Sequence, residues 1–569
     1  MLLKQKLIIF AMMIGIFLCM LDTTVMNIAL PAIQSGLNIN LSTLSWALNV
    51  YTITFAVFTI PFGRIADIMG RNKLYLIGLL LFSLGSILSG SAPGAGLLIS
   101  GRGIQSLGAA IIFPASMTIG ISATSMASRV KTLAALGVTQ GFATAFGPTI
   151  GGIVTQFWSW RAVFFINLPF VMIVIILCLF LLPLRNEPQM AAKIDIGGML
   201  LSMTMLFCLT LALIKGNDWH WNSPIIIGLF GIVAGSLVGF IIIERRTPDP
   251  MVPLTLFKNR QFSGATIAVV LTGIFLTAIL VIMPTFFTKI LGKTELTAAF
   301  MITPASLMIF FVSPIGGTLL EKVGPRVLIF TGFAQIIGGY ALLSIINPAN
   351  YLKTAISLVL VGGGFGLIAG PVVVLGAANF TGKLLSASQS VLGVFRQIGT
   401  LLAVAIFVSA LSANLTAARH QSTIEANARI AAAQTLTPKA KRDFRNAADQ
   451  IITTGGTHQI GAPQNAAIPR TETLKLIQTN YQQTIDRLPH GSQLPKDQRQ
   501  LIHAKVTQAV THQVKSQNLV ISAVSHQIKT TTKKNMTSAF MKLYQVALPF
   551  TIIAALASFL FDRKQTYLK

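Results

Sequence analysis

The sequence predicts an all-helical protein that crosses a membrane many times, and two observations support this prediction. Of the 569 residues, 53% are hydrophobic and only 10% are charged, whereas soluble chains carry about 25% charged residues. The apolar residues also gather into runs long enough to cross a hydrocarbon layer of about 30 Å as helices. The fourteen runs cover roughly residues 7–33, 42–63, 74–92, 97–121, 132–156, 162–183, 196–215, 224–243, 262–288, 298–320, 326–346, 354–377, 388–411 and 543–561.

The distribution of charge predicts the orientation of the chain. The net charge is +27. Most basic residues lie either in one polar segment or in the short loops that are expected on the same side of the membrane as the N-terminus. Short basic loops stay in the cytoplasm, and an even number of crossings places both termini on one side. We therefore expect a multi-pass protein of the cytoplasmic (plasma) membrane with both termini cytoplasmic. Membrane lipids account for the charge, so we expect no nucleic-acid partner.

Residues 412–542 differ from the rest of the chain, because apolar runs give way to Gln, Thr, Ala and basic residues. This segment joins the last two runs, so we expect it to be extracytoplasmic. We interpret its histidines as solvated surface, since their spacing fits no metal site. Turns are expected at 455–456 and 489–491, between the helices of a small hairpin or bundle. The apolar residues at helical spacing are Ile502, Val506, Val510, Val514, Ile521, Val524 and Ile528.

Asp22 is a carboxylate inside the first apolar run. No residue from Leu7 to Met20 is charged, and Asp22 lies about 22 Å along a helix that begins at Leu7. A charge at this depth costs at least about 2.5–3.5 kcal/mol, so it indicates a functional site by default. The other fifteen of the sixteen acids lie in the polar segment, in the tail, or at predicted helix ends and loops. The alternative is a buried Asp bonded by neighbouring Thr and Asn side chains.

Two copies of one pattern lie where an apolar run enters a basic loop: a glycine, an acid four residues later and a glycine three residues after that. Two related halves indicate a transporter built from structural repeats. We expect the acid of the first copy to bind an arginine or a helix N-terminus and so hold one conformation. The alternative is an ordinary solvated loop. The copies are Gly63, Asp67 and Gly70, followed by Arg71, and Gly317, Glu321 and Gly324, followed by Arg326.

The first copy resembles the signature loop of the major facilitator superfamily, with Ile68 and Asn72 in place of the more usual basic residues. Residues 147–152 resemble the antiporter motif of the drug-exporting branches of that family. Generic close packing of helices is the alternative interpretation of these glycines. The motif residues are Gly147, Pro148, Gly151 and Gly152.

Residues 98–110 resemble the motif of the fourth helix, with Ser106 in place of a glycine. The resemblance implies that Arg102 takes part in proton transfer, whereas a structural arginine bonded to backbone carbonyls is the alternative. Residues 21–31, 158–169 and 395–399 resemble further marks of the fourteen-helix drug:proton antiporter branch. The resemblance covers nearly every apolar run but not the polar segment.

The resemblance implies a division of the chain into two six-helix bundles around a cavity, with two extra helices between them. Residues 1–186 then form the N-terminal bundle, 187–250 the two inserted helices and 251–411 the first five helices of the C-terminal bundle. Residues 412–542 are the polar insertion, and 543–569 are the last helix with a cytoplasmic tail. We expect a monomer without a cofactor. No nucleotide-binding loop occurs, so we do not expect ATP as the energy source, and no catalytic or metal-binding cluster occurs, so we expect neither an enzyme nor a metal site.

The function implied by the resemblance is export of amphipathic, cationic compounds in exchange for protons, with membrane lipids as surroundings. Proton and cation would compete for Asp22, because a carboxylate cannot serve both at once. One proton entering for one monovalent cation leaving moves no net charge, so the pH gradient and not the voltage would drive export. The alternatives are a lipid or fatty-acid exporter and a non-transporting surface protein that binds cell-wall or anionic polymer. The expected coupling residues are Asp22, Asn27, Arg102, Gln105 and Arg396.

Overall fold

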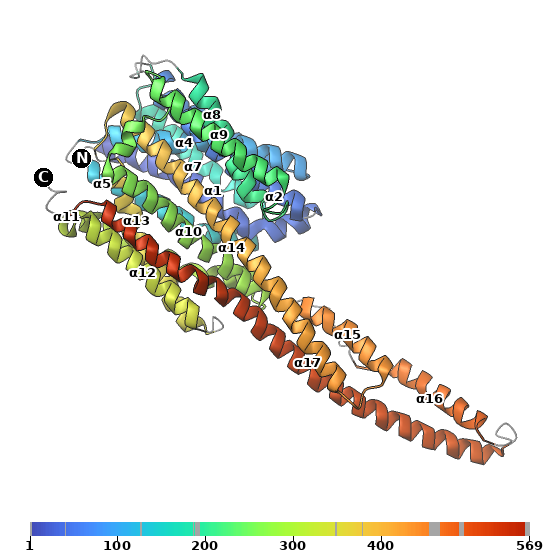
Figure 1. The fold of residues 1–569 in the computed structure, drawn as a ribbon. Helices are drawn as coiled ribbons and strands as arrows, with labels where there is room; N and C mark the ends of the chain where they lie inside the picture. The colour runs from blue at the N-terminus through green and yellow to red at the C-terminus, as the bar shows by residue number, and fades with distance from the viewer. Residues whose placement is uncertain are drawn as a thin grey trace. The chain divides into compact units, whose positions relative to one another are not determined.

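The computed structural model describes residues 3–39, 41–125, 128–185, 187, 194–346, 350–377, 379–453, 467–488 and 494–563. Within these ranges the chain is helical and contains no strand (Figure 1), which confirms the all-helical class. Thirteen helices of this part are long and apolar enough to cross a membrane. The helix α5, Arg129–Phe157, has the length but is richer in Gly and Thr.

The helices follow the expected apolar runs to within a few residues at most of their ends. One run is divided into two helices, α6 and α7, which meet at Ile166. The bounds are α1 Leu3–Leu37, α2 Leu41–Met69, α3 Arg71–Gly90, α4 Ala95–Ser122, α5 Arg129–Phe157, α6 Ala162–Phe165, α7 Asn167–Leu181, α8 Ile196–Lys215, α9 Pro224–Arg246, α10 Arg260–Lys289, α11 Glu295–Val323, α12 Pro325–Ile345, α13 Tyr351–Leu375, α14 Gly382–Ala432, α15 Pro438–Thr453, α16 Arg470–Asp486 and α17 Lys496–Ala555, with short 3₁₀ turns at Leu254–Lys258 and Leu556–Leu560.

Two helices run far beyond the apolar runs that predicted them. The helix α14 has 51 residues and α17 has 60, so each exceeds the roughly 20 residues that cross a bilayer. The physical reason is an absence of helix breakers: residues 412–432 and 496–548 contain no Gly and no Pro. Hydropathy marks where a membrane segment ends, but Gly and Pro mark where a helix ends.

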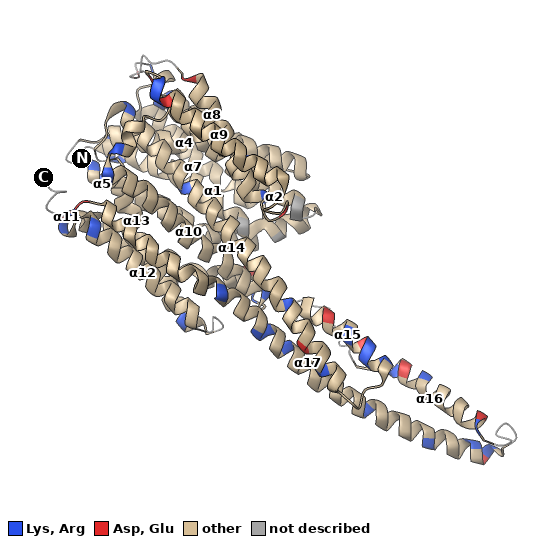
Figure 2. Cartoon of the chain, viewed as in Figure 1, with Lys and Arg blue, Asp and Glu red and all other residues tan. Residues whose placement is uncertain are grey.

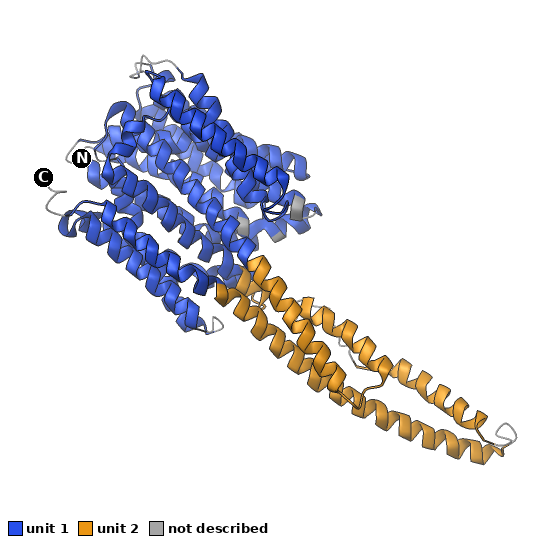
Figure 3. Cartoon of the chain, in the orientation of Figure 1, with its two compact units in different colours: residues 1–284, 294–410, 543–569 blue, residues 285–293, 411–542 orange. Residues whose placement is uncertain are grey.

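The chain divides into two compact units (Figure 3). Unit 1 comprises Met1–Pro284, Thr294–Ala410 and Leu543–Lys569, and unit 2 comprises Thr285–Lys293 and Leu411–Lys542. Unit 1 contains the helices that carry every motif of the family resemblance.

The glycines that end the two repeated patterns have the same backbone role. Gly70 precedes α3 with φ of 110°, and Gly324 precedes α12 with φ of 84°. Side-chain-bearing residues rarely adopt such angles, so both chain reversals require glycine. The repeat predicted from the sequence is thus a repeat of backbone geometry at two helix starts.

Helix α5 lies between helices of the two halves of unit 1. The Thr149 and Thr303 hydroxyl oxygens, on α5 and α11, lie 3.1 Å apart, and Ser306 of α11 donates to the carbonyl of Ala145 at 2.5 Å. Nearer the other end of α5, a Cβ on Gly137 would lie 3.1 Å from the Val373 side chain of α13. The two halves therefore meet along most of α5.

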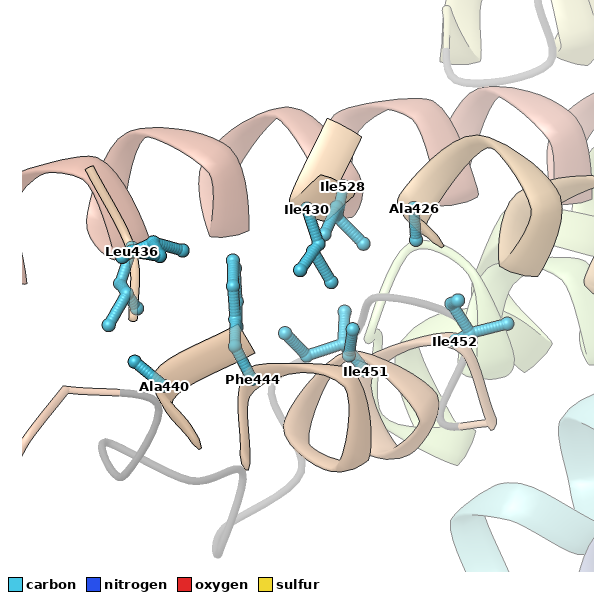
Figure 4. Close-up of a cluster of buried hydrophobic side chains, with 10 residues drawn as sticks. Ala426, Ile430, Leu436, Ala440, Phe444, Ile451, Ile452 and Ile528 are labelled. Atoms are coloured by element: carbon cyan, nitrogen blue, oxygen red, sulfur yellow. The ribbon is translucent and has the colours of Figure 1, made fainter. Parts of the chain in front are cut away.

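Unit 2 has its own apolar core (Figure 4). Ile430 of α14, Phe444 of α15 and Ile521 and Ile528 of α17 belong to one buried cluster. A second cluster joins Ile477 of α16 to α17. The expected helical character of this segment is confirmed for the described residues, and the apolar spacing on α17 is explained by these contacts. The expected turns at 455–456 and 489–491 lie outside the described residues.

Candidate functional site

Asp22 on α1 has two polar partners on the neighbouring helix α4. The guanidinium of Arg102 forms an ion pair with Oδ2 of Asp22, and the Gln105 amide donates to Oδ1 at 2.9 Å. Arg102 also donates to the Gln105 side-chain oxygen at 2.8 Å. The spacing of three residues places Arg102 and Gln105 on one face of α4, so a single helix face supplies both partners.

Two further helices take part in this network. The Gln105 amide donates to Ser86 of α3 at 2.9 Å, and Asn167 of α7 donates to the same Ser86 oxygen at 3.3 Å. The backbone of α3 approaches closely here, because a Cβ at Gly85 would collide with the backbone of Gln105. Four helices of the N-terminal half therefore meet around one carboxylate.

The guanidinium of Arg102 is held on two more sides. Its Nε donates to the carbonyl of Ala47 at 3.3 Å, and its carbon lies 4.1 Å from the ring centroid of Tyr51. This is cation–π contact, which contributes more when it is desolvated. The Tyr51 hydroxyl in turn donates to the carbonyl of Cys19.

The network is sealed from solvent in this conformation. The exposed fraction is 1% for Asp22 and 0% for Arg102 and Gln105. A buried ion pair is retained only when its charges are paired and hydrogen-bonded. Both carboxylate oxygens of Asp22 and the Nε and Nη1 atoms of Arg102 have partners, whereas Nη2 of Arg102 has no hydrogen-bond partner among the described residues. The expected cation at Asp22 is thus, in this conformation, a side chain of the same protein, and no surface of the carboxylate is left for a cargo.

The remaining expected partners of Asp22 are placed elsewhere. The Thr23 and Thr24 hydroxyls donate to carbonyls of their own helix, to Met20 and Leu21. The side chain of Asn27 lies outside the described residues. Arg396 lies on α14 with its Nε buried and without a partner in the part of the chain that the structure describes, and there it makes no contact with the Asp22 network.

A second polar cluster connects the two halves of unit 1 at the end where α2 meets α3. We refer to this end as the basic end and to the cluster as the basic-end cluster. Asp67 is 4% exposed; its Oδ1 accepts from Arg71 at 2.7 Å and from Ser386 of α14 at 2.8 Å. A Cβ on Gly63 would collide with Ser390 of α14, so glycine permits the contact between α2 and α14.

The corresponding acid of the second repeat has no such role. Glu321 is exposed, and among the described residues it forms no ion pair. A Cβ on Gly317 would lie 2.9 Å from Ala134 of α5, so this glycine permits close helix packing. The repeated pattern therefore yields one engaged acid and one solvated acid.

The segment between α9 and α10 joins the basic-end cluster through Asp249. Its carboxylate lies 2.8 Å from Nζ of Lys383 on α14 and 3.6 Å from the Arg64 guanidinium on α2. The hydrogen bond from Lys383 lowers the pKa of Asp249, so this carboxylate stays charged to lower pH than usual. Arg129 of α5 adds another tie, donating to the carbonyls of Ala377 and Phe380.

Helix α4 connects the two clusters. It carries Arg102 near its beginning and Thr118 near its end, and the Ser386 hydroxyl that bonds Asp67 lies 3.4 Å from the Thr118 hydroxyl. Sixteen residues of helix separate Arg102 from Thr118, or about 24 Å. One helix therefore contacts both clusters.

The glycines of residues 147–152 permit close contact between α5 and its neighbours. A Cβ on Gly147 would collide with Thr24 of α1, and one on Gly151 would lie 2.7 Å from the Val25 carbonyl oxygen. A Cβ on Gly152 would lie 3.3 Å from Ala299 of α11. Pro148 is accommodated within the helix. This motif thus brings α5 against the helix that carries Asp22.

Sequence reasoning missed several residues of these clusters. Ser86, Ser386 and Asp249 gave no signal, because serines are common in helices and an acid in a loop is ordinary. Tyr51 is fully buried beside Arg102, and an aromatic residue in an apolar run is equally ordinary.

Comparison with known proteins identifies the family. The sequence model of the Major Facilitator Superfamily matches residues 12–404. The chain belongs to the Major Facilitator Superfamily. Residues 405–569, which contain most of unit 2, lie outside the matched range.

Several relatives in this family have known names. Multidrug resistance protein Stp of Mycobacterium tuberculosis is 31% identical over 417 residues, covering 73% of this chain and 77% of that protein. Multidrug transporter protein MdtP of Bacillus subtilis is 31% identical over 399 residues, covering 70% and 73%. Riboflavin transporter RibZ of Clostridioides difficile is 28% identical over 417 residues, covering 73% and 90%.

A solved structure supports the fold. The proton:xylose symporter XylE is 13% identical, with a TM-score of 0.51 over 71% of this chain and 87% of that one. The predicted family, its multidrug-efflux type and the major facilitator fold are therefore confirmed. The chain is a multi-pass membrane transporter and not an enzyme.

Proposed function

We propose that the protein exports amphipathic, cationic compounds across the cytoplasmic membrane in exchange for protons, and that Asp22 carries the proton. The buried network of Asp22, Arg102 and Gln105 supports this proposal, because a single proton on Asp22 would remove one charge of a buried ion pair. The names of the relatives, which include multidrug transporters and a riboflavin transporter, support small organic compounds as cargo.

The physical effect of protonation follows from burial. A proton on Asp22 removes one charge of the pair and leaves Arg102 buried and uncompensated. Breaking a buried pair in this way costs about 3–5 kcal/mol. A conformation in which Arg102 reaches water or another acceptor then becomes preferred. Protonation therefore acts as a switch between two arrangements of α1 and α4.

The basic-end cluster supplies the second state-dependent contact. Asp67, Ser386 and Asp249 close the basic end in the conformation described here, and α4 links this closure to Arg102. We propose that this end is cytoplasmic, with both termini on that side and residues 412–542 outside. The conformation with the charged Asp22–Arg102 pair is then closed to the cytoplasm.

An aromatic cluster is a candidate surface for cargo. The ring centroids of Phe142 and Phe146 on α5 lie 4.4 Å apart, and Phe142 lies 5.0 Å from Phe310 on α11 and 5.9 Å from Phe17 on α1. These rings are partly exposed, and they come from both halves of unit 1. Aromatic faces attract organic cations. Cargo bound there would act on Asp22 through the helices, because direct contact requires the Asp22–Arg102 pair to open.

Uptake of a labelled cation into membrane vesicles tests this proposal. The assay uses everted membrane vesicles, tetraphenylphosphonium as a lipophilic monocation, and an imposed pH gradient with the membrane potential clamped by potassium and valinomycin. We expect uptake driven by the pH gradient and little affected by the potential, since exchange of one proton for one monocation moves no net charge. Uptake driven by the potential alone would contradict the proposed exchange.

The variant for this assay is Asp22→Asn combined with Arg102→Gln. It removes both charges together, so no buried charge is left unpaired and the helices can still pack. We expect normal protein levels and no pH-driven uptake. Unchanged pH-driven uptake by this variant would remove Asp22 from the mechanism. We propose a monomer as the functional unit, with protons, membrane lipids and cargo as its partners.

A further inference from the structure

The charges of unit 2 are unevenly distributed among its helices. Residues 411–542 contain 17 Lys and Arg residues and 6 Asp and Glu residues. All six acids lie at or before Asp497, and the next acid in the chain is Asp562. Figure 2 shows the result: acids lie on α14, α15 and α16, whereas the charged residues of α17 beyond its first turn are all basic.

Six of the eleven Lys, Arg and His residues of α17 share one face of the helix. At 100° per residue they fall within an arc of about 120°. They extend over 28 residues, or about 42 Å of helix. We refer to these residues as the α17 stripe: Lys505, His512, Lys515, His526, Lys529 and Lys533.

The apolar face of α17 is already occupied. Val510 and Val514 pack with Ile477 of α16, and Ile521 and Ile528 pack with the cluster around Phe444. Five of the six stripe residues are exposed and Lys529 is half-buried. The stripe therefore lies opposite the packed face and is open to solvent along its length.

No acid of the segment neutralises the stripe. All six acids of residues 411–542 are among the described residues. In that part of the chain none of the stripe's lysines lies in an ion pair, whereas Lys439 of α15 pairs with Glu472 of α16. That hydrogen bond raises the pKa of Lys439. The basic residues of α15 and α16 are thus partly compensated, and the lysines of the α17 stripe are not.

We propose that the α17 stripe binds a linear polymer of phosphate groups in the extracytoplasmic space. The inference rests on the orientation given under the proposed function. An uncompensated row of cations about 42 Å long matches a flexible polyanion that runs along a helix, because several phosphates then gain counter-charges at once. A membrane surface fits less well, since a helix that lies in a membrane interface needs a free apolar face, and this one is packed.

Binding to the purified full-length protein in detergent tests the proposal. The probe is fluorescently labelled sodium polyphosphate of defined length, and the readout is fluorescence anisotropy at several salt concentrations. Four neutralised phosphates, one for each lysine of the stripe, predict a slope of log K against log salt near −3, at about −0.7 for each phosphate of a flexible chain. No binding at low salt would overturn the proposal.

Two variants with the same change in charge provide the decisive comparison. The first carries Lys505→Gln, Lys515→Gln, Lys529→Gln and Lys533→Gln; the second carries Arg442→Gln, Arg445→Gln, Lys475→Gln and Arg487→Gln on α15, α16 and the residue after α16. We expect at least tenfold weaker binding for the first variant and less than a twofold change for the second. An equal loss of affinity in both variants would show that net charge alone matters and would overturn the proposal that the stripe is the binding site.

The remaining outcomes separate other occupants. Tighter binding of polyuridylate than of polyphosphate at equal phosphate concentration would overturn the proposal in favour of a nucleic acid. Flotation of the nanodisc-embedded protein with vesicles of phosphatidylglycerol and phosphatidylcholine, without polyphosphate binding, would overturn it in favour of a lipid surface.

The location is tested separately with Ser522→Cys, on the exposed side of α17. The three native cysteines are buried, so a membrane-impermeant maleimide has little background reaction. We expect labelling in intact cells, and labelling only after lysis would overturn an external polymer. Transport by the first four-lysine variant is measured in parallel; we expect it to be unchanged, so a failure of the stripe and a failure of antiport remain distinguishable.

Discussion

The Asp22–Arg102 pair makes a prediction about stability that can be worked out from its burial. With exposed fractions of 1% and 0%, removal of either charge leaves the other buried without a partner. Each single change, Asp22→Asn or Arg102→Gln, should lower the free energy of unfolding by about 3–5 kcal/mol. The double change removes both charges, so the cost of an uncompensated buried charge does not arise. The double variant should therefore recover most of the loss.

The assay is denaturation of the native protein, the two single variants and the double variant in one detergent, monitored by tryptophan fluorescence. The coupling energy of the double-mutant cycle should be about 3 kcal/mol or more. The exposed pair Lys439–Glu472 of unit 2 serves as the control, and its cycle should give a much smaller coupling. If Asp22→Asn is as stable as the native protein, the reasoning from burial is refuted, because Arg102 would then tolerate the loss of its partner.

Two further predictions concern the glycine contacts and the basic end. Gly151→Ala should destabilise the protein by about 1–3 kcal/mol, because its Cβ would crowd the α1 backbone. The control is Gly231→Ala on α9, which has open space around it and should be neutral or stabilising by up to about 1 kcal/mol. Equal effects of the two changes in a denaturation assay would argue against the contact between α5 and α1. Asp67→Asn should weaken the contacts at the basic end, since hydrogen bonds to a charged group contribute about 1.5–3 kcal/mol. A cysteine introduced by Ser390→Cys should then react at least tenfold faster with a thiol reagent, whereas Glu321→Gln should leave that rate unchanged. A faster reaction with Glu321→Gln but not with Asp67→Asn would contradict the difference between the two acids.

Hydropathy located the helices well because burial in lipid requires long apolar runs, and it failed where a helix leaves the apolar region. The continuation of α14 to Ala432 depends on the lack of Gly and Pro after residue 411, a signal independent of hydropathy. The same reasoning applies to α17, whose first 47 residues precede the last apolar run. A breaker-based reading of these segments would have predicted both continuations.

The candidate site was predictable in its members but not in its connections. Asp22 and Arg102 each stood out because a charge in an apolar run is costly. Their pairing joins residues 80 positions apart, and no local spacing encodes such a contact. Ser86 carries no charge and no unusual spacing, so its contribution could come only from the packing of α3 against α4.

The internal repeat shows a further limit of sequence patterns. Gly70 and Gly324 have equivalent backbone roles, as their positive φ angles require. Asp67 and Glu321 do not, because Asp67 meets Ser386 on α14 while Glu321 faces outward. A pattern within one segment predicts that segment's backbone, whereas the role of its acid depends on a partner from elsewhere in the chain.

Proton release on cargo binding tests the exchange most directly. Purified protein in weakly buffered solution with a pH indicator is mixed with tetraphenylphosphonium. We expect the native protein to release protons, because cargo favours the conformation in which Asp22 is charged and paired with Arg102. The double variant Asp22→Asn/Arg102→Gln should bind the cation and release none. Undiminished proton release from that variant would contradict a proton carried by Asp22.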